Sequence, residues 1–154
     1  MSANLDRFDL AILNILQKDN TTPQRVIGET IGLSTPAVQR RIRRLEETGV
    51  IRANVALVEP SQVGRSLTIL TEVHLRTERS HLETEFRRRV QAEAAVQQCY
   101  FITGEADYLL VITVASMEEY EALSQRLFFT ETEHIPYQTS VVLNRLKVGM
   151  NVPV

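Results

Sequence analysis

The sequence predicts an α+β chain in two parts, in which three helices precede a βαββαβ unit. Three observations predict this class. Apolar residues recur at helical spacing up to about residue 48, and from Leu67 they alternate with polar residues, as in a half-buried strand. Segments typical of strands and helices then follow in the order βαββαβ. The length of 154 residues accommodates two small domains.

The first two helices have recognisable starts. Asp6 is a candidate N-cap, and the helix that it begins ends near residue 18. Thr22 and Pro23 mark the second start, a cap followed by proline at the first helical position. Gly28 costs about 1 kcal/mol of helix propensity relative to alanine, which indicates that another helix approaches closely there. The apolar faces consist of Leu5, Phe8, Ile12, Ile15, Leu16, Val26, Ile27 and Ile31.

A short connection leads to the third helix. Gly32 ends the second helix, either Ser34 or Thr35 caps the third, and Gly49 ends it. Two helices joined by about four residues that include a glycine are typical of a helix-turn-helix. In that motif the exposed face of the second helix enters the major groove of DNA.

The third helix has one apolar and one basic face. On a helical wheel Val38, Ile42 and Leu45 form the core face, whereas Gln39, Arg40 and Arg43 point away from it. Arginine reads guanine and glutamine reads adenine, so these three residue types suit base readout. An alternative interpretation is a solvated arginine face paired with Glu46 and Glu47.

Further residues suit contact with the DNA backbone. Ser34 and Thr35 lie at the helix N-terminus, Arg44 flanks the outward face, and Arg52 follows in a β-rich segment. Arg41 lies beside the core and is either structural or a phosphate contact. The predicted DNA-contacting residues are Ser34, Thr35, Gln39, Arg40, Arg43, Arg44 and Arg52.

The charge distribution agrees with a DNA-binding front part. The first 52 residues contain eight basic and six acidic groups, a net charge of +2, whereas residues 53–154 have a net charge of −4. The longest apolar stretch spans eight residues, too few for a membrane span, and we expect no signal peptide. One cysteine, Cys99, excludes an internal disulfide. We therefore expect a cytoplasmic, nucleoid-associated protein without membrane association.

The remaining chain predicts a linker and a second domain. Residues 50–58 are β-rich and indicate a strand or wing. We predict a helix-turn-helix domain over 1–52, a β-strand linker over 53–65 and an effector-binding and oligomerisation domain over 66–154. In that domain helices cover one sheet face, and apolar residues on the other face indicate coverage by a second subunit. The predicted elements are strands at Leu67–Leu75, Val96–Thr103, Tyr108–Val114 and Tyr137–Val148, and helices at Ser80–Gln91 and from Ser116.

At this point the sequence resembles the Lrp/AsnC (leucine-responsive/asparagine-responsive, feast/famine) transcriptional regulators. The segments that carry the resemblance, in order, are LDRFDLAILNILQKD, IGLSTPAVQRRIRRLEETGVI, TGEADYLLVITVASMEEY and TSVVLNRLK. The resemblance implies a winged helix-turn-helix followed by a ferredoxin-like βαββαβ domain of the RAM/ACT type. It also implies sheet-to-sheet homodimers that assemble further, commonly to an octamer, and an amino-acid effector, with no other cofactor.

The resemblance implies an effector site between dimers. One side is the loop at Gly104, Glu105, Asp107 and Tyr108, and the neighbouring subunit contributes Thr139, Ser140 and Val141, with Met117 near the same interface. An amino acid needs acceptors for its ammonium, such as Glu105 or Asp107, and donors for its carboxylate. Hydroxyls such as that of Thr103 suit the second role, and Gly104 permits close approach of the backbone. The alternative is that 104–107 is only a β-turn.

One segment departs from the family pattern. Phe128–Pro136 carries a different charge and an added aromatic pair where relatives have a hydrophobic-Pro-Gly-Val type sequence. This leaves the identity of the effector and the octameric contact open.

Three functions compete. The first is a sequence-specific regulator that binds a pseudo-palindromic operator and responds to an amino acid. The second is an architectural DNA-binding protein without an effector. The third is an enzyme, which we do not expect, because His74, His81 and His134 lack metal-ligand spacing and Cys99 sits in an apolar strand, more typical of a core residue.

Overall fold

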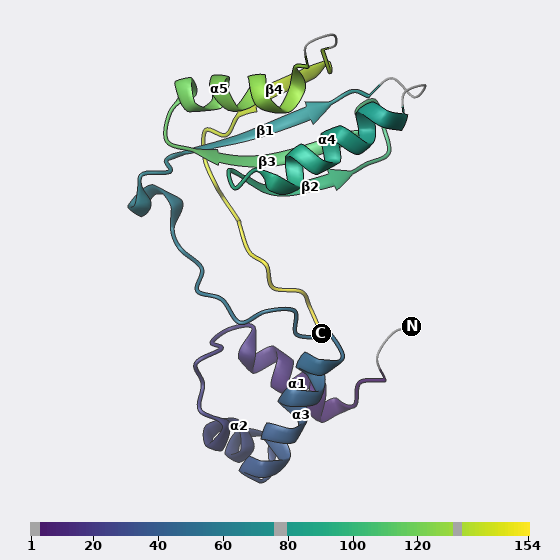
Figure 1. The fold of residues 1–154 in the computed structure, drawn as a ribbon. Coiled ribbons are helices and arrows are strands. Elements are labelled where there is room, and N and C mark those ends of the chain that lie inside the picture. Colours follow the sequence, from purple (N-terminus) through teal and green to yellow (C-terminus); the bar gives the residue numbers. More distant parts are fainter. Residues whose placement is uncertain (1–3, 76–79, 131–133) are drawn as a thin grey trace. The chain divides into compact units, whose positions relative to one another are not determined.

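The computed structural model describes residues 4–75, 80–130 and 134–154 (Figure 1). The chain forms two compact units. One comprises the chain up to Leu57 together with Lys147–Val154, and the other comprises Val58–Leu146. The predicted α+β class is confirmed, with three helices in the first unit and a βαββαβ order in the second.

The N-terminal unit consists of α1 (Arg7–Leu16), α2 (Gln24–Ile31) and α3 (Thr35–Glu47). Asp6 caps α1, since its side chain accepts from the N–H groups of Phe8 and Asp9 while Asp9 accepts from the Asp6 N–H. The N-cap of α3 is Ser34, and Gly49 adopts the left-handed conformation that ends it. The N-cap of α2 is Pro23 rather than the predicted Thr22, so this helix begins one residue later than predicted. The buried core is Ile12, Leu13, Ile27, Val38 and Leu45.

The turn between α2 and α3 requires a glycine. A Cβ atom at Gly28 would overlap the carbonyl oxygen of Leu33, whose N–H donates to the Gly28 carbonyl at 2.9 Å. The close neighbour is therefore the turn itself, with Val38 of α3 in ordinary contact behind it. The prediction of a close approach at Gly28 identified the position, although the tightest contact comes from the turn and not from a helix.

The segment after α3 corrects one prediction. Residues 50–58 form no strand, and the predicted β-strand linker of 53–65 contains only a 3-10 helix at Pro60–Val63. A strand needs a neighbouring strand for its backbone hydrogen bonds, and the described residues of this chain supply none beside the segment. Its apolar side chains remain exposed, at 63% for Val55 and 75% for Leu57.

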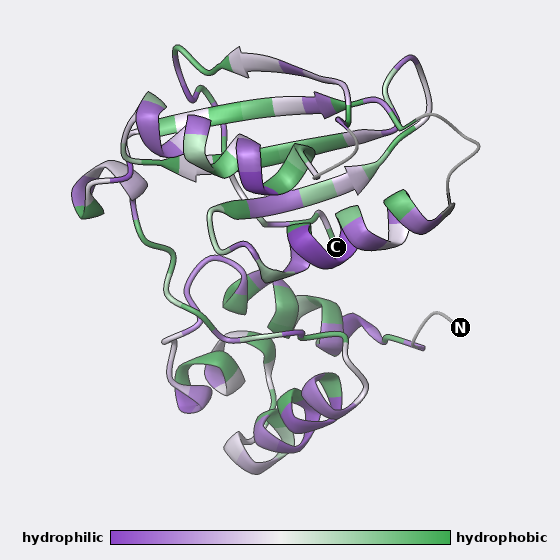
Figure 2. Cartoon of the chain, turned by 45° about the horizontal axis from the view of Figure 1, so that its top comes forward, coloured by the Kyte–Doolittle hydropathy of each residue, from purple (hydrophilic) through white to green (hydrophobic). Residues whose placement is uncertain are grey.

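The C-terminal unit is a four-stranded antiparallel sheet with α4 (Ser80–Ala92) and α5 (Met117–Phe128) on one face (Figure 1). The strands lie in the order β2 (Val96–Phe101), β3 (Tyr108–Val114), β1 (Leu67–Val73) and β4 (Tyr137–Val141). The central strands are largely hydrophobic and the helices carry alternating polar and apolar bands (Figure 2), as expected for elements with one buried face.

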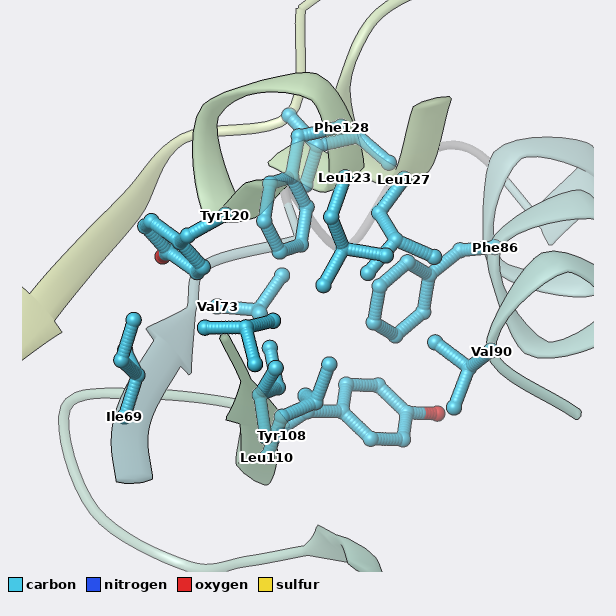
Figure 3. Packing of buried hydrophobic residues seen from close by; sticks show 13 residues of the cluster. Ile69, Val73, Phe86, Val90, Tyr108, Leu110, Tyr120, Leu123, Leu127 and Phe128 are labelled. Carbon is cyan, nitrogen blue, oxygen red and sulfur yellow. The ribbon is translucent and has the colours of Figure 1, made fainter. Parts of the chain in front are cut away.

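The core of this unit lies between the sheet and the two helices. Phe86 and Val90 of α4 and the apolar side of α5 point toward Ile69, Val73 and alternate residues of β3 (Figure 3). Tyr108, Leu110, Ile112 and Val114 face the helices, whereas Leu109, Val111 and Leu70 lie on the other face and are half-buried. The strand alternation therefore decides which side of β3 the helices leave uncovered.

The C-terminal end departs from the sequence expectation in its strand length and in where its tail packs. The last strand ends at Val141 instead of Val148, because β1 begins at Leu67 and the hydrogen-bonded ladder ends with Val142 N–H donating to Thr68. The tail 147–154 was assigned to the effector domain but packs in the N-terminal unit. There the Gln17 side chain bonds both backbone groups of Val152, and Asn14 donates to the Val154 carbonyl.

Cys99 also differs from the expectation of a core position. It lies on β2, at the edge of the sheet, and is exposed. No helix in the described ranges is long and apolar enough to cross a membrane.

Candidate DNA-binding helix and ligand-binding loop

The seven side chains assigned to DNA share one property, which is exposure. They lie on α3, at its N-terminus and in the segment that follows it: Ser34, Thr35, Gln39, Arg40, Arg43, Arg44 and Arg52. Val38 and Leu45 of the same helix are fully buried, so α3 has the two-faced character that the wheel predicts. A basic helix face of this kind suits the major groove.

The outward side chains of α3 are available for DNA. Within the described parts of the chain, Arg40 and Gln39 have neither a hydrogen-bonding nor an ion-pair partner. Arg43 donates to Glu47 at 2.8 Å, but both side chains are mostly exposed. An exposed pair of this spacing stabilises by about 0.3–0.5 kcal/mol, little enough for DNA to replace it. The alternative interpretation was a solvated arginine face paired with Glu46 and Glu47, and the Arg43–Glu47 pair agrees with that interpretation.

Arg44 and Arg41 point toward α1 instead. Arg44 donates to Asp9 at 2.5 Å, and Arg41 donates to both Asp9 and Asp6, at 2.8 and 2.7 Å. The Arg41 contacts favour its structural interpretation. Asp9 is fully buried, and the sequence did not predict these contacts. Its position beside the apolar stripe of α1, four residues from Leu13, is the signal that could have identified it.

The predicted ligand loop joins β2 to β3. Ile102 N–H donates to the Asp107 carbonyl and Asp107 N–H donates to the Val73 carbonyl, both at 2.9 Å. Gly104 has a φ of 132°, where glycine is favoured, and no described residue lies within 4 Å of the place a Cβ would occupy. As far as the described residues go, the top of this loop is therefore open to a molecule that approaches the backbone.

The two acidic residues of the loop have different environments. The Asp107 carboxylate accepts the Leu75 N–H at 2.6 Å and so ties the loop to the end of β1. Glu105 is exposed, and its backbone carbonyl, rather than its carboxylate, contacts His74 Nδ1 at 3.1 Å. Of the two acceptors expected for an ammonium, Glu105 is the more available.

Tyr108 is a core residue rather than part of the loop surface. It is 3% exposed and packs edge-on against Phe86, and its hydroxyl donates to Glu83 at 2.6 Å and accepts from Arg87 at 2.8 Å. Burial, together with the Glu83 carboxylate, raises the pKa of Tyr108, while the bond from Tyr108 lowers the pKa of Glu83. A ligand above the loop would not reach this hydroxyl without rearrangement of α4.

One chain does not bring the other predicted ligand residues to the loop. Thr139 and Ser140 are successive residues of β4 and face opposite sides of the sheet. Thr139 faces the helices, where its hydroxyl meets Tyr120 at 2.6 Å, and Tyr120 meets the buried Thr71 at 3.0 Å. β1 separates β4 from the strand that carries the loop. Met117, 45% exposed, begins α5 after the far end of β3.

The atypical segment packs into the core at both of its described ends. Phe128 is fully buried and stacks on Tyr137 with a centroid distance of 4.2 Å, and Ile135 is also buried. Arg89 donates to the carbonyls of Leu127 and Phe129 at 3.0 and 3.1 Å and so caps the end of α5. Residues 131–133 of the segment lie outside the described residues.

This architecture defines a DNA-binding protein with a separate ligand-binding domain. Residues 5–52 match the winged helix-turn-helix DNA-binding model, and residues 68–152 match the Lrp/AsnC ligand binding domain. The chain belongs to the Lrp/AsnC family, which confirms the resemblance. It is a DNA-binding transcriptional regulator that carries a small-molecule-binding domain.

Relatives along nearly the whole chain are transcriptional regulators. An uncharacterised HTH-type transcriptional regulator of Sinorhizobium fredii is 38% identical over 150 residues, which cover 97% of this chain and 89% of that protein. The glutamate uptake regulatory protein of Zymomonas mobilis is 36% identical over 127 residues, which cover 82% and 77% respectively.

Solved structures share the fold. The AsnC family transcriptional regulator of Agrobacterium tumefaciens superposes with a TM-score of 0.88 at 30% identity and covers 97% of both chains. A transcriptional regulator of Neisseria meningitidis in complex with L-Met gives a TM-score of 0.85 at 29% identity, with coverage of 97% and 96%.

Proposed function

We propose that this regulator binds a pseudo-palindromic DNA site as a homodimer or larger assembly, and that an amino acid modulates its assembly or DNA affinity. The observation that carries the proposal is that, in the part of the chain that the structure describes, the loop at Gly104 and Glu105 is open and Arg40 and Gln39 have no partner. Two-fold related recognition helices would read half-sites about 34–36 Å apart. Base contacts are assigned to Gln39, Arg40 and Arg43, and phosphate contacts to Ser34, Thr35 and Arg52.

The open face of the sheet supports a homodimer. Leu70 pairs with Val111 across β1 and β3, and Tyr100 pairs with Leu109 across β2 and β3. All four side chains lie on the face without helices, and Tyr100 is 50% exposed. Apolar side chains on an uncovered sheet face favour burial against a second copy of the same face. Association of dimers to an octamer is part of the proposal.

The ligand site is then completed between subunits. Thr103, Gly104 and Glu105 of one chain would meet the exposed edge of β4, at Thr139, Ser140 and Val141, from a neighbour. Glu105, with Asp107 behind it, offers an acceptor to an ammonium, and loop N–H groups and hydroxyls offer donors to a carboxylate. The L-Met complex and the glutamate uptake regulator among the relatives support an amino acid as the class of ligand. Met117 would lie near the same interface.

The first experiment is a thermal-shift screen of the twenty amino acids at millimolar concentration. A ligand at 100 times its Kd adds about 2.7 kcal/mol of stability, which raises the Tm by a few degrees. A hit must also alter the affinity for DNA or the sedimentation of the complex. Glu105→Gln should reduce the shift, and Glu118→Gln, on the exposed start of α5, serves as the matched control.

A second function has one observation in its favour. Asp107 is already engaged by Leu75, as expected if the loop were only a turn in an architectural DNA-binding protein without an effector. A screen without hits, in a chain that retains DNA binding, would favour this second function over the first.

A further inference from the structure

The carboxylate of Asp9 joins α1 to α3 inside the N-terminal unit. Arg41 Nη1 donates to Oδ1 at 2.8 Å, and Arg44 Nη2 donates to Oδ2 at 2.5 Å. The Asp6 N–H also donates to Oδ2, at 3.0 Å. The Asp9 side chain is 1% exposed, against 22% for Arg41 and 49% for Arg44. We call Asp9, Arg41 and Arg44 the ion triad.

Apolar packing sets the rotation of α3 about its axis only coarsely. Val38 and Leu45 are buried against Ile12 and Leu13, but hydrophobic contact has little directional preference. Hydrogen bonds between a guanidinium and a carboxylate are directional, and the planar arginine fork adds geometric specificity. Because two arginines one turn apart bind both oxygens of one carboxylate, the ion triad fixes the rotation of α3.

The rotation of α3 is also the orientation of its DNA-reading face. Arg40 and Arg43 directly precede Arg41 and Arg44 in the sequence and point outward from the same turns. A rotation that broke the triad would carry both outward arginines with it. Base readout requires side chains placed to hydrogen-bonding accuracy, whereas phosphate attraction tolerates displacement.

We propose that the ion triad positions the recognition helix for sequence readout, and that Arg44 acts through Asp9 rather than as a DNA contact. The proposal rests on the DNA-binding function and replaces the earlier prediction for Arg44. It assigns a role in DNA recognition to Asp9, an acidic residue that faces away from DNA.

The first test uses the sign of a charge change. The wild-type chain selects its site from a pool of randomised duplexes, and its affinities for that site and for a scrambled duplex are then measured.

Asp9→Asn keeps the shape of the side chain but removes a negative charge from a DNA-binding unit. Electrostatics alone would tighten binding. If the triad positions the helix, Asp9→Asn should have about tenfold lower affinity for the selected site and unchanged affinity for the scrambled duplex. Unchanged or tighter binding of the selected site by the folded variant overturns the proposal.

The second test uses salt dependence. Arg44→Gln leaves Asp9 paired with Arg41, so this variant retains a charged partner for the buried carboxylate. A lost phosphate contact would reduce the slope of log K against log salt by about 0.9 for each subunit bound, whereas a positioning residue leaves the slope unchanged. We expect weaker selected-site binding with the wild-type slope. A slope reduced by about one for each subunit bound overturns the proposal.

Two comparisons complete the design. Arg40→Gln makes the same change on the outward face and should relax the base preference in a repeated selection. Arg44→Gln should weaken binding without changing the preferred base at any single position. The double variant Asp9→Asn/Arg44→Gln should lose no more affinity than the worse single variant, because the residues act as one unit. Additive losses overturn the proposal.

Folding and function are separated by two controls. Circular dichroism and the Tm establish whether each variant is folded at the binding temperature. If Asp9→Asn is not folded, the salt dependence of DNA binding by Arg44→Gln decides whether the proposal holds. A wild-type chain that selects no sequence overturns sequence-specific binding and this proposal together. A wild-type chain that selects a site, with variants that bind it equally well, overturns this proposal alone.

Discussion

The DNA-binding helix and the ligand-binding loop differ in how much of each interface one chain supplies. On α3, Gln39, Arg40 and Arg43 share one exposed face of a single helix. The residues assigned to the ligand lie on both faces of the sheet and at both ends of β3. Tyr108 among them is buried, and Asp107 is occupied by a backbone N–H.

This difference follows from what each interface reads. A major groove accepts one helix, so local periodicity can place every reading side chain. A small molecule must be enclosed, and enclosure needs several elements or several chains. The following predictions test this contrast, from the largest expected effect to the smallest.

The largest effect is expected where the recognition helix depends on its turn. Gly28→Ala forces a Cβ against the Leu33 carbonyl, and overpacking of this kind costs about 1–3 kcal/mol, which exceeds the gain in helix propensity. Thermal unfolding should show a lower Tm for the helical unit, with DNA binding lost at lower temperature. Glu29→Ala, exposed and one residue further on, should change stability by less than about 0.5 kcal/mol. Equal stability of the two variants would contradict the tight turn.

The next effect concerns base readout. Arg40→Ala should weaken binding to the selected site by about 1–3 kcal/mol, because an arginine that has no partner among the described residues is removed from the groove. Titration of labelled DNA measures the loss. Arg88→Ala, in the C-terminal unit, removes an exposed arginine that pairs with Glu85 and should leave DNA affinity nearly unchanged. Equal losses would indicate nonspecific attraction instead of a reading face.

A smaller effect is expected at the loop. Asp107→Ala leaves the Leu75 N–H without its acceptor and should lower the free energy of unfolding by about 1 kcal/mol. Glu105→Gln should leave stability unchanged and reduce only the response to a ligand. Chemical denaturation and the thermal-shift assay separate the two. If Glu105→Gln destabilises the chain as much as Asp107→Ala, the division of roles in the loop is wrong.

The smallest effect is a pH dependence of stability that arises from ion pairs within α4. Hydrogen bonds from Arg88 and then Arg89 lower the pKa of Glu85 to about 2, from an ordinary value of 4.5. Since the folded pKa is the lower one, the stabilisation is present above pH 4.5 and is lost as the pH falls toward 2. An NMR titration of the Glu85 carboxyl should give this midpoint, and Arg88→Gln should raise it. DNA affinity near neutral pH should not respond.

Much of the fold was predictable because its signals are local. Asp6, Ser116 and Gly49 lie at the helix ends that they predict, and β3 spans the predicted Tyr108–Val114. The strand expected at 50–58 and the extension to Val148 were wrong, since strand propensity does not supply a neighbouring strand. The assignment of Arg44 to DNA stays a prediction, and the helical wheel behind it gives the direction of the side chain but not its contact with Asp9.

The sequence by itself determined the two-part organisation, the family, and the outward face of α3, because apolar periodicity and caps act over a few residues. Only the tertiary structure decided that Asp9 binds Arg41 and Arg44, that Asp107 ties the loop to β1, and that the tail 147–154 packs in the N-terminal unit. These contacts join residues more than 30 positions apart, and a partner at that separation is selected by the packing of whole elements rather than by local pattern.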